Sequence, residues 1–236
     1  LPKGARVVQL LQRWVEDYEQ AHGYLLTKTP LMAKRELYKI SGHWDHYLDG
    51  MFVMGDPNDE EKECFALRPM TCPFQYQVYL NRKRSYRDLP IRYGEFGACH
   101  RNEPSGSLHG LMRVRGFTQD DGHIFCTEDQ ILSECTAYTK LVQKVYADYG
   151  FTDISYKIAT RPEKRIGDDA TWDKAEKALM DALDASGIKY DILPGEGAFY
   201  GPKIDFHLED SIGRTWQCGT IQLDFQLPQR FECEYI

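Results

Sequence analysis

Helices are predicted wherever large apolar residues recur every three or four positions, because that spacing places them on one face of a helix. Thr127 can cap the start of the strongest such run, and Gly150 can end it. Pro73 suits the first turn of a short helix, where its missing N–H is no loss. In chain order, the predicted helices cover residues 7–18, 73–80, 127–150 and 171–185.

Shorter apolar runs separated by turn residues predict strands. A polar loop at residues 55–62 lies between two of these runs and predicts a hairpin, and a long loop at 102–111 joins two others. The predicted extended segments cover residues 24–30, 51–53, 64–67, 91–96, 113–119, 154–159, 190–193, 203–208, 215–219 and 221–225. Strands joined by hairpins, with helices beside them, favour an α+β fold with a mostly antiparallel sheet flanked by helices.

Composition narrows the class of protein further. The chain has 236 residues, of which 42% are hydrophobic and 13% aromatic, too many for a disordered chain. No apolar run approaches the roughly 20 residues of a membrane span. The seven cysteines are an odd number without a C-x-x-C pair, which favours reduced thiols over a disulfide framework. Together these features predict a soluble, cytoplasmic protein.

The net charge of −7 argues against a free-standing nucleic-acid-binding module, which usually carries a basic surface. Residues 81–87 (NRKRSYR) are nevertheless a local basic segment.

Candidate chemistry is concentrated in residues 94–126, which hold many polar groups for a strand–loop–strand segment. Arg101, at a strand end, can hold a phosphate or a carboxylate with two parallel hydrogen bonds. Glu103 can accept a hydrogen bond from an exocyclic amine, and Phe117 can offer a face to a purine ring. From the pattern alone, a charged hairpin with Arg101 in a surface ion pair is an equal alternative.

This segment resembles the second signature motif of class II aminoacyl-tRNA synthetases, and among them that of the threonyl-tRNA synthetases. Other segments resemble the core of the same family in the same order, so that the resemblance spans nearly the whole chain. They are residues 41–45 (SGHWD), 70–73 (MTCP), 160–165 (TRPEKR), 195–203 (GEGAFYGPK) and 216–225 (WQCGTIQLDF).

The resemblance implies ATP-dependent activation of threonine to threonyl-adenylate, followed by transfer to the 3′ end of tRNA(Thr), with Mg²⁺ bridging the phosphates. It also implies a homodimer, and the region from the first helix through Trp44 and Phe52 is the candidate interface. The implied catalytic residues are Arg101 and His43. The implied ATP-binding residues are Arg101, Glu103, Met112, Arg113, Val114, Phe117, Gln217 and Thr220. The implied threonine-binding residues are Met70, Arg101, Gln119, Asp121, Tyr200 and Gln222.

Zinc is the cofactor that the resemblance adds, with Cys72 and His123 as its first two ligands. The helix N-terminus favours a thiolate at Cys72, although a lone Cys and a lone His so far apart are more often core residues. A third ligand, a His, is implied beyond residue 236, and His207 and His109 are substitutes within the chain. Zinc could bind the amine and hydroxyl of threonine, with Asp121 accepting the hydroxyl proton. Such a site rejects valine, which an apolar pocket cannot do.

One departure from the family pattern is that no third class II motif, a Gly-rich segment ending in Arg, is found before Ile236. No editing or anticodon-binding domain is visible either. Residues 1–236 are therefore interpreted as an incomplete catalytic core that has little or no adenylation activity alone.

Three alternatives remain open: a seryl- or prolyl-type relative, a non-catalytic module that binds a ligand or RNA, and a structural domain stabilised by zinc. For single residues, His43 could be a structural histidine beside Trp44, and Lys203 is a weaker catalytic candidate that could simply be solvated.

Overall fold

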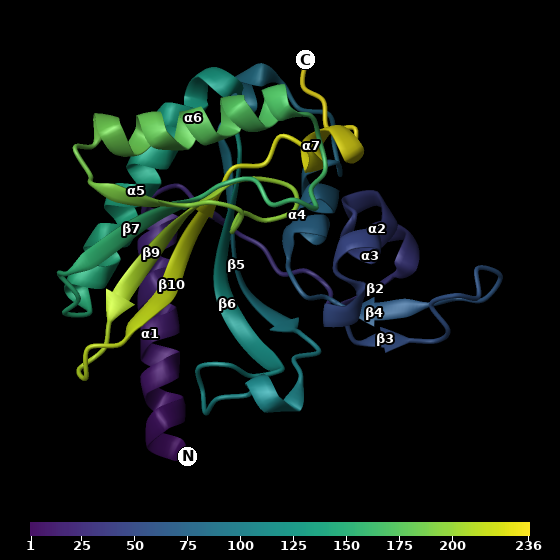
Figure 1. Cartoon of the computed structure of the whole chain (residues 1–236), viewed down its shortest axis with the longest axis horizontal. Helices are drawn as coiled ribbons and strands as arrows, with labels where there is room; N and C mark the ends of the chain where they lie inside the picture. The colour runs from purple at the N-terminus through teal and green to yellow at the C-terminus, as the bar shows by residue number, and fades with distance from the viewer. The chain divides into compact units, whose positions relative to one another are not determined.

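The computed structural model describes all residues from Leu1 to Ile236, and its contacts divide the chain into two units. Unit 1 consists of Leu1–Phe125 together with Arg230–Ile236, and unit 2 consists of Cys126–Gln229 (Figure 1). Unit 2 is thus inserted into the sequence of unit 1.

Unit 1 begins with α1 (Pro2–Ala21), which starts earlier than predicted because Pro2 fits the first turn of a helix. The helix α4 (Cys72–Tyr79) confirms the prediction from Pro73. Gly42, with a left-handed φ of 81°, separates the two remaining helices of this part, which the apolar spacing did not predict. They are α2 (Arg35–Ser41) and α3 (His43–His46), and short 3₁₀ turns follow at Leu48–Gly50, Tyr86–Asp88 and Ser105–Ser107.

Unit 1 contains two three-stranded sheets. In the first, β5 (Ile91–His100) lies between β1 (Leu25–Leu26), which is parallel to it, and β6 (Gly116–Phe125), which is antiparallel. In the second, β4 (Phe65–Leu67) pairs with antiparallel β2 (Met32–Lys34) and β3 (Val53–Met54), which confirms the predicted hairpin.

The strand predicted at residues 113–119 was wrong at both ends. Strand β6 starts at Gly116 and continues to Phe125, because each of its residues has a partner along the whole length of β5. Arg113 instead lies in a turn, where it forms an isolated bridge with His109.

A buried ion pair joins the elements of unit 1. Arg68 and Glu95 have side chains that are each 2% exposed, with Nη2 of Arg68 3.0 Å from Oε1 of Glu95. Glu95 also accepts hydrogen bonds from the Gln75 side chain at 2.7 Å and from the backbone N–H and hydroxyl of Thr29. The pair therefore connects β5, α4 and the segment before β2.

Aromatic packing closes unit 1 around Tyr76 of α4. The rings of Phe125, at the end of β6, and Phe231, in the returning C-terminal segment, have centroids 5.2 Å and 4.9 Å from that of Tyr76. The last residue pairs with the basic segment, because Ile236 accepts a backbone hydrogen bond from Tyr86 and donates one to Arg84, both at 2.9 Å.

Unit 2 is a four-stranded sheet with the order β10-β9-β7-β8 and two long helices, α5 (Ile131–Asp148) and α6 (Asp169–Ala185). Apolar residues of both helices pack on β7 and β9 and form its core. The strands are β7 (Ile154–Ala159), β8 (Tyr190–Leu193), β9 (Lys203–Glu209) and β10 (Thr215–Gln222). A 3₁₀ turn (Glu128–Gln130) precedes α5, and the short helix α7 (Leu227–Arg230) leads back into unit 1.

The predicted strand at 215–219 and the start of the one at 221–225 form a single strand, β10, which has a bulge between Gln217 and Gly219 and ends at Gln222. The bulge adds a residue to β10 without ending the strand. Elsewhere the pairing is mostly antiparallel, with β1–β5 and β7–β8 as the parallel pairs, so the α+β prediction is confirmed. None of the helices has the length and apolar character that crossing a bilayer requires.

Candidate functional site

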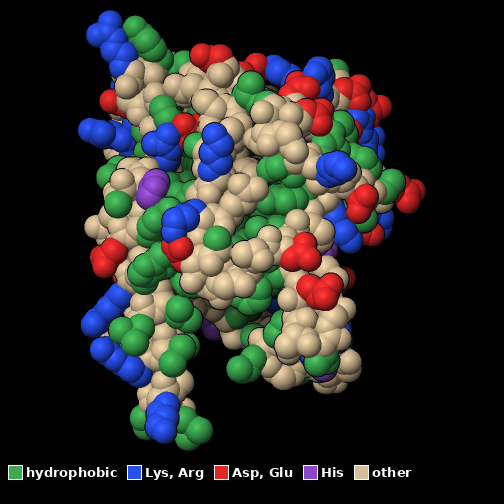
Figure 2. Space-filling model, turned by 90° about the vertical axis from the view of Figure 1, so that its left-hand side faces the viewer, with side chains coloured by type: hydrophobic (Ala, Val, Ile, Leu, Met, Phe, Trp, Pro, Cys, Tyr) green, Lys and Arg blue, Asp and Glu red, His purple; other side chains and the backbone are tan.

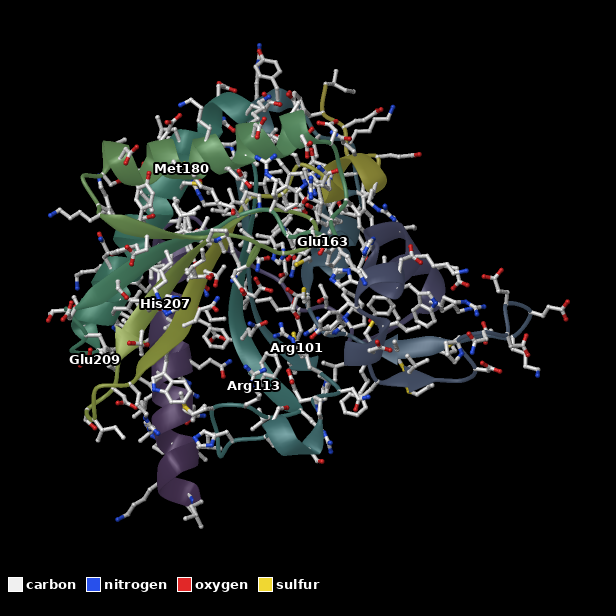
Figure 3. The ribbon with its side chains drawn as sticks, viewed as in Figure 1. Arg101, Arg113, Glu163, Met180, His207 and Glu209 are labelled. Atoms are coloured by element: carbon white, nitrogen blue, oxygen red, sulfur yellow. The ribbon has the colours of Figure 1, made fainter.

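Arg101 and Phe117 lie together at the end of the β5–β6 hairpin. Arg101, labelled in Figure 3, follows β5. Its guanidinium carbon is 5.0 Å from the centroid of the Phe117 ring on β6. Its Nε donates to the carbonyl oxygen of Pro69 at 3.2 Å, and its backbone N–H donates to Arg115 at 2.9 Å. Because no carboxylate pairs with it, Arg101 keeps donors for an anion, and the surface ion pair considered above is not formed.

The loop between β5 and β6 brings Glu103 and Arg113 into an ion pair with a separation of 3.5 Å. Arg115 fixes the loop by donating from Nε to the carbonyl oxygen of Glu103 at 2.9 Å. Met112 is exposed and Val114 half-buried in the same loop. The loop therefore gathers the ATP-binding residues predicted in unit 1 near one strand end.

His43 is fully buried, and both its ring nitrogens have partners. Nδ1 is 2.8 Å from the hydroxyl of Ser41 and Nε2 is 3.4 Å from the sulfur of Met70. Burial first, and then the positive charge of Arg101, lowers the pKa of His43 to about 4. At neutral pH this imidazole is therefore uncharged.

This histidine should make the stability of the protein depend on pH. An unfolded histidine binds a proton near pH 6.5, whereas folded His43 does so only near pH 4, so the unfolded state binds more protons between these values. The contribution of His43 to the free energy of unfolding should therefore fall as the pH falls through this window, by about 3 kcal/mol at about 1.4 kcal/mol per pH unit. Burial raises the pKa of Glu19 to about 8 and that of Asp120 to about 6, and these two groups act in the opposite direction, so the effect of His43 is read from the difference in slope between the wild type and His43→Gln. Urea unfolding between pH 7 and 4 measures it. His43→Gln should flatten this dependence, whereas the exposed His22→Gln should not, and equal slopes in all three proteins would contradict the assignment.

A second group of predicted residues lies where α4 meets β6. The hydroxyl of Thr71, next to Cys72, donates a hydrogen bond to the carboxylate of Asp121. Oδ1 of Asp121 is 3.6 Å from Nδ1 of His123, which is buried and has no hydrogen-bond partner. Gly97 permits the close approach of β5, because a Cβ there would lie 2.5 Å from Cγ2 of Thr71.

No three His, Cys, Asp or Glu side chains of the chain form a cluster able to hold a metal. Of the substitutes for a third ligand, His109 lies in the β5–β6 loop and His207 lies on β9 in unit 2. Gln119, predicted to contact threonine, is exposed on β6 opposite Gly97.

Unit 2 brings three polar residues together around Asp205, a buried residue that was not predicted from the sequence. One oxygen of Asp205 accepts from Nε2 of Gln217 at 2.7 Å and from Oγ1 of Thr220 at 3.1 Å, and the other accepts from Nζ of Lys203 at 2.6 Å. Its position between Ile204 and Phe206 is the ordinary alternation of a half-buried strand, so the sequence carried no signal that Asp205 is buried.

Lys203 is therefore paired and mostly buried, contrary to the interpretation as a solvated strand lysine. In the same unit the hydroxyl of Tyr200 donates to the side-chain oxygen of Gln222, which brings these two predicted threonine-binding residues into contact. The basic segment at residues 81–87 exposes fewer cationic side chains than the sequence suggested. Arg84 is buried and donates to Tyr93 and to backbone carbonyl groups.

Comparison with known proteins identifies one family. The profile of the family described as "tRNA synthetase class II core domain (G, H, P, S and T)" matches residues 52–236. A threonine–tRNA ligase from Herminiimonas arsenicoxydans is 59% identical over the whole chain, and one from Leptothrix cholodnii is 58% identical. The chain spans about 36% of the length of these relatives.

Solved structures agree with the sequence comparison. A structure described as the RNA binding domain of threonyl-tRNA synthetase from Cryptosporidium parvum matches all of this chain and 57% of its own, with 43% identity and a TM-score of 0.94. A putative threonyl-tRNA synthetase from Aeropyrum pernix matches 91% of this chain and 50% of its own, with 36% identity and a TM-score of 0.78. A prolyl-tRNA synthetase from Giardia lamblia covers the whole chain with a TM-score of 0.71 at 18% identity, which is a similarity of fold.

Proposed function

Since the chain belongs to the class II core-domain family of tRNA synthetases, we propose that its protein activates threonine with ATP and transfers it to the 3′ end of tRNA(Thr). The observation that carries the proposal is Arg101, unpaired by any carboxylate and 5.0 Å from the Phe117 ring at the end of the β5–β6 hairpin. Relatives and structures named for threonine support this substrate over the seryl and prolyl alternatives.

The proposed chemistry is attack of the threonine carboxylate on the α-phosphate of ATP, which releases pyrophosphate. The protein contributes mainly position and charge, as in other phosphate chemistry. Arg101 would hold the carboxylate and the α-phosphate as negative charge builds on them. Phe117 and Glu103 would hold adenine, while Gln217 and Thr220 would contact the nucleotide. Mg²⁺, when bound with ATP, would neutralise negative charge on the phosphates. Neutral His43 would take up a proton during transfer to tRNA.

The test is threonine-dependent exchange of radioactive pyrophosphate into ATP by the natural polypeptide that carries this chain. Threonine should support exchange, and valine should support far less. Residues 1–236 alone should show little or no exchange. ATP binding without any exchange in the natural polypeptide would instead favour a non-catalytic binding module.

For zinc, the chain supplies two donors. The buried Nδ1 of His123, which lacks a hydrogen-bond partner, fits a metal ligand, and Cys72 stands beside Thr71 at the start of α4. The third ligand implied by the resemblance is a His beyond residue 236. When bound, zinc would supply open coordination positions for the amine and hydroxyl of threonine. Asp121 would accept the hydroxyl proton, and Thr71 would hold this carboxylate in place.

Removal of either donor should therefore remove the metal. We expect about one zinc per natural polypeptide by elemental analysis, and Cys72→Ala or His123→Ala should weaken zinc binding by more than about 100-fold, the upper range for loss of a residue that only orients a ligand. Cys218→Ala, at an exposed cysteine in unit 2, is the matched control and should keep its zinc. Wild-type zinc content in the first two variants would exclude this site.

A homodimer is proposed through α1, whose N-terminal half exposes apolar side chains. Val7 is 55% and Val8 63% exposed, and Leu10 and Leu11 are exposed beside them. Figure 2 shows hydrophobic side chains at the surface of this face of the molecule. Trp44, part of the interface expected from the sequence, is instead buried in a core cluster, because it packs with Tyr38 and Phe74. The proposal therefore leaves α1 as the candidate contact.

Charge on this face should weaken the dimer. Val8→Glu with Leu11→Glu should shift the protein from dimer to monomer in sedimentation, because each burial of an apolar side chain of this size is worth about 1.5–3 kcal/mol. Gln9→Glu, on the same helix turn, is the control. A wild-type protein that is monomeric at all concentrations would exclude the interface.

A further inference from the structure

The arrangement around Asp205 depends on the bulge in β10. Residues 217 and 220 are three positions apart, so a regular strand would turn their side chains to opposite faces. In the observed register Gln217 lies opposite His207, Gly219 opposite Phe206 and Thr220 opposite Asp205, so that Cys218 has no partner. This extra residue resets the alternation and turns Gln217 and Thr220 to the same side, toward Asp205.

Gly219 is part of the same bulge. A Cβ at this position would lie 2.5 Å from the phenolic oxygen of Tyr146 on α5, so a side chain here would push the bulge away from the helix. The bulge is therefore packed between α5 and β9 rather than free to rearrange.

The chemistry of Asp205 then determines which end of the Gln217 amide points inward. An ionised carboxylate can only accept hydrogen bonds, so it holds the NH₂ end of the amide. The same Nε2 donates to Oγ1 of Thr220 at 2.9 Å, and Thr220 donates its own proton to Asp205 at 3.1 Å. Nζ of Lys203 donates to the other oxygen of Asp205 at 2.6 Å. No protein group donates to Oε1 of Gln217.

We propose that Asp205 is a positioning residue that fixes the polarity of the Gln217 amide, so that Gln217 presents its carbonyl oxygen, an acceptor, to the bound nucleotide. This inference rests on the proposed function, in which Gln217 and Thr220 contact ATP. The carbonyl oxygen of Gln217 would then contact a hydrogen-bond donor of ATP or the hydrated cation of MgATP. It would not contact a phosphate oxygen, because a phosphate oxygen needs a hydrogen-bond donor.

The test is a double-mutant cycle for MgATP affinity, measured by titration calorimetry on the natural polypeptide. Gln217→Ala should weaken binding about tenfold, and Asp205→Asn should have a similar effect, because an Asn can turn its NH₂ toward Gln217 and release or reverse the amide. If Asp205 acts through Gln217, the double variant should bind no more weakly than Gln217→Ala. Asp191→Asn, on exposed β8 of the same sheet, is the matched control.

A second measurement does not depend on the stability of Asp205→Asn. In wild-type protein labelled with ¹⁵N-glutamine, the side-chain amide signals that disappear in Gln217→Ala should show slowed hydrogen exchange before any nucleotide is added. Amide signals like those of a fully solvated glutamine would overturn the proposal. Unchanged MgATP affinity in Asp205→Asn would also overturn it, as would a double variant whose fold-loss in affinity equals the product of the losses in the two single variants. Failure of wild-type protein to bind MgATP would overturn the proposed function itself, a result distinct from these.

Discussion

Arg68→Met should lower the free energy of unfolding by about 3–5 kcal/mol, the range found when one partner of a buried ion pair is removed. The reason is that Glu95, 2% exposed, would keep a charge in the interior without the guanidinium. Arg68 also donates to the backbone carbonyl of Ala98 at 2.7 Å, so its loss leaves that group unsatisfied as well. Chemical denaturation followed by circular dichroism measures the change.

The control separates the lost charge from lost packing. Arg68→Met combined with Glu95→Leu removes both charges, and the double variant should be more stable than Arg68→Met, since replacing a whole buried pair with apolar groups is often neutral. If the double variant were less stable than Arg68→Met, the charge of Glu95 would not be the cause of the loss.

Arg101→Ala should reduce threonine-dependent pyrophosphate exchange by about 10²–10³-fold, as removal of one preorganised donor to a developing charge does in other enzymes. Arg101 is a cation of the β5–β6 hairpin that no carboxylate neutralises, and the hydrogen bond from its Nε to Pro69 fixes its direction. Arg101→Lys should restore little activity, because an ammonium cannot make two parallel hydrogen bonds.

A matched control is Arg87→Ala. Arg87 also lies over an aromatic ring, that of Tyr86 at 5.5 Å, but belongs to the exposed basic segment. Its loss should leave exchange near the wild-type rate. Equal losses for the two arginines would show that the contact with an aromatic ring, and not the position of Arg101, is what matters.

The long elements were predictable because they follow from local pattern. Apolar runs between turn residues located β7 and β9, and helical spacing located α5 and α6. Strand β6 was misplaced because its polar residues, among them Asp121, face the site and break the apolar pattern that marks a strand.

The group around Asp205 could not be predicted from the sequence, for a different reason. The bulge that turns Gln217 toward Asp205 is a property of the pairing between β9 and β10, and single-strand patterns contain no information about it. Likewise, the buried state of His43 depends on α2, α3 and Met70 meeting in three dimensions, so its neutral form at pH 7 could not be inferred from the chain alone.

The stacking on Tyr76 has a consequence for how this chain can be divided or rebuilt. The chain leaves unit 1 after Phe125 and re-enters it just before Phe231, and both rings pack on the same tyrosine. The two cut ends that excision of residues 126–229 would create are thus already neighbours, so a short glycine-rich bridge could join them. Unit 2 is therefore a continuous insertion that could be replaced or expressed separately, with the path of the unit 1 backbone unchanged.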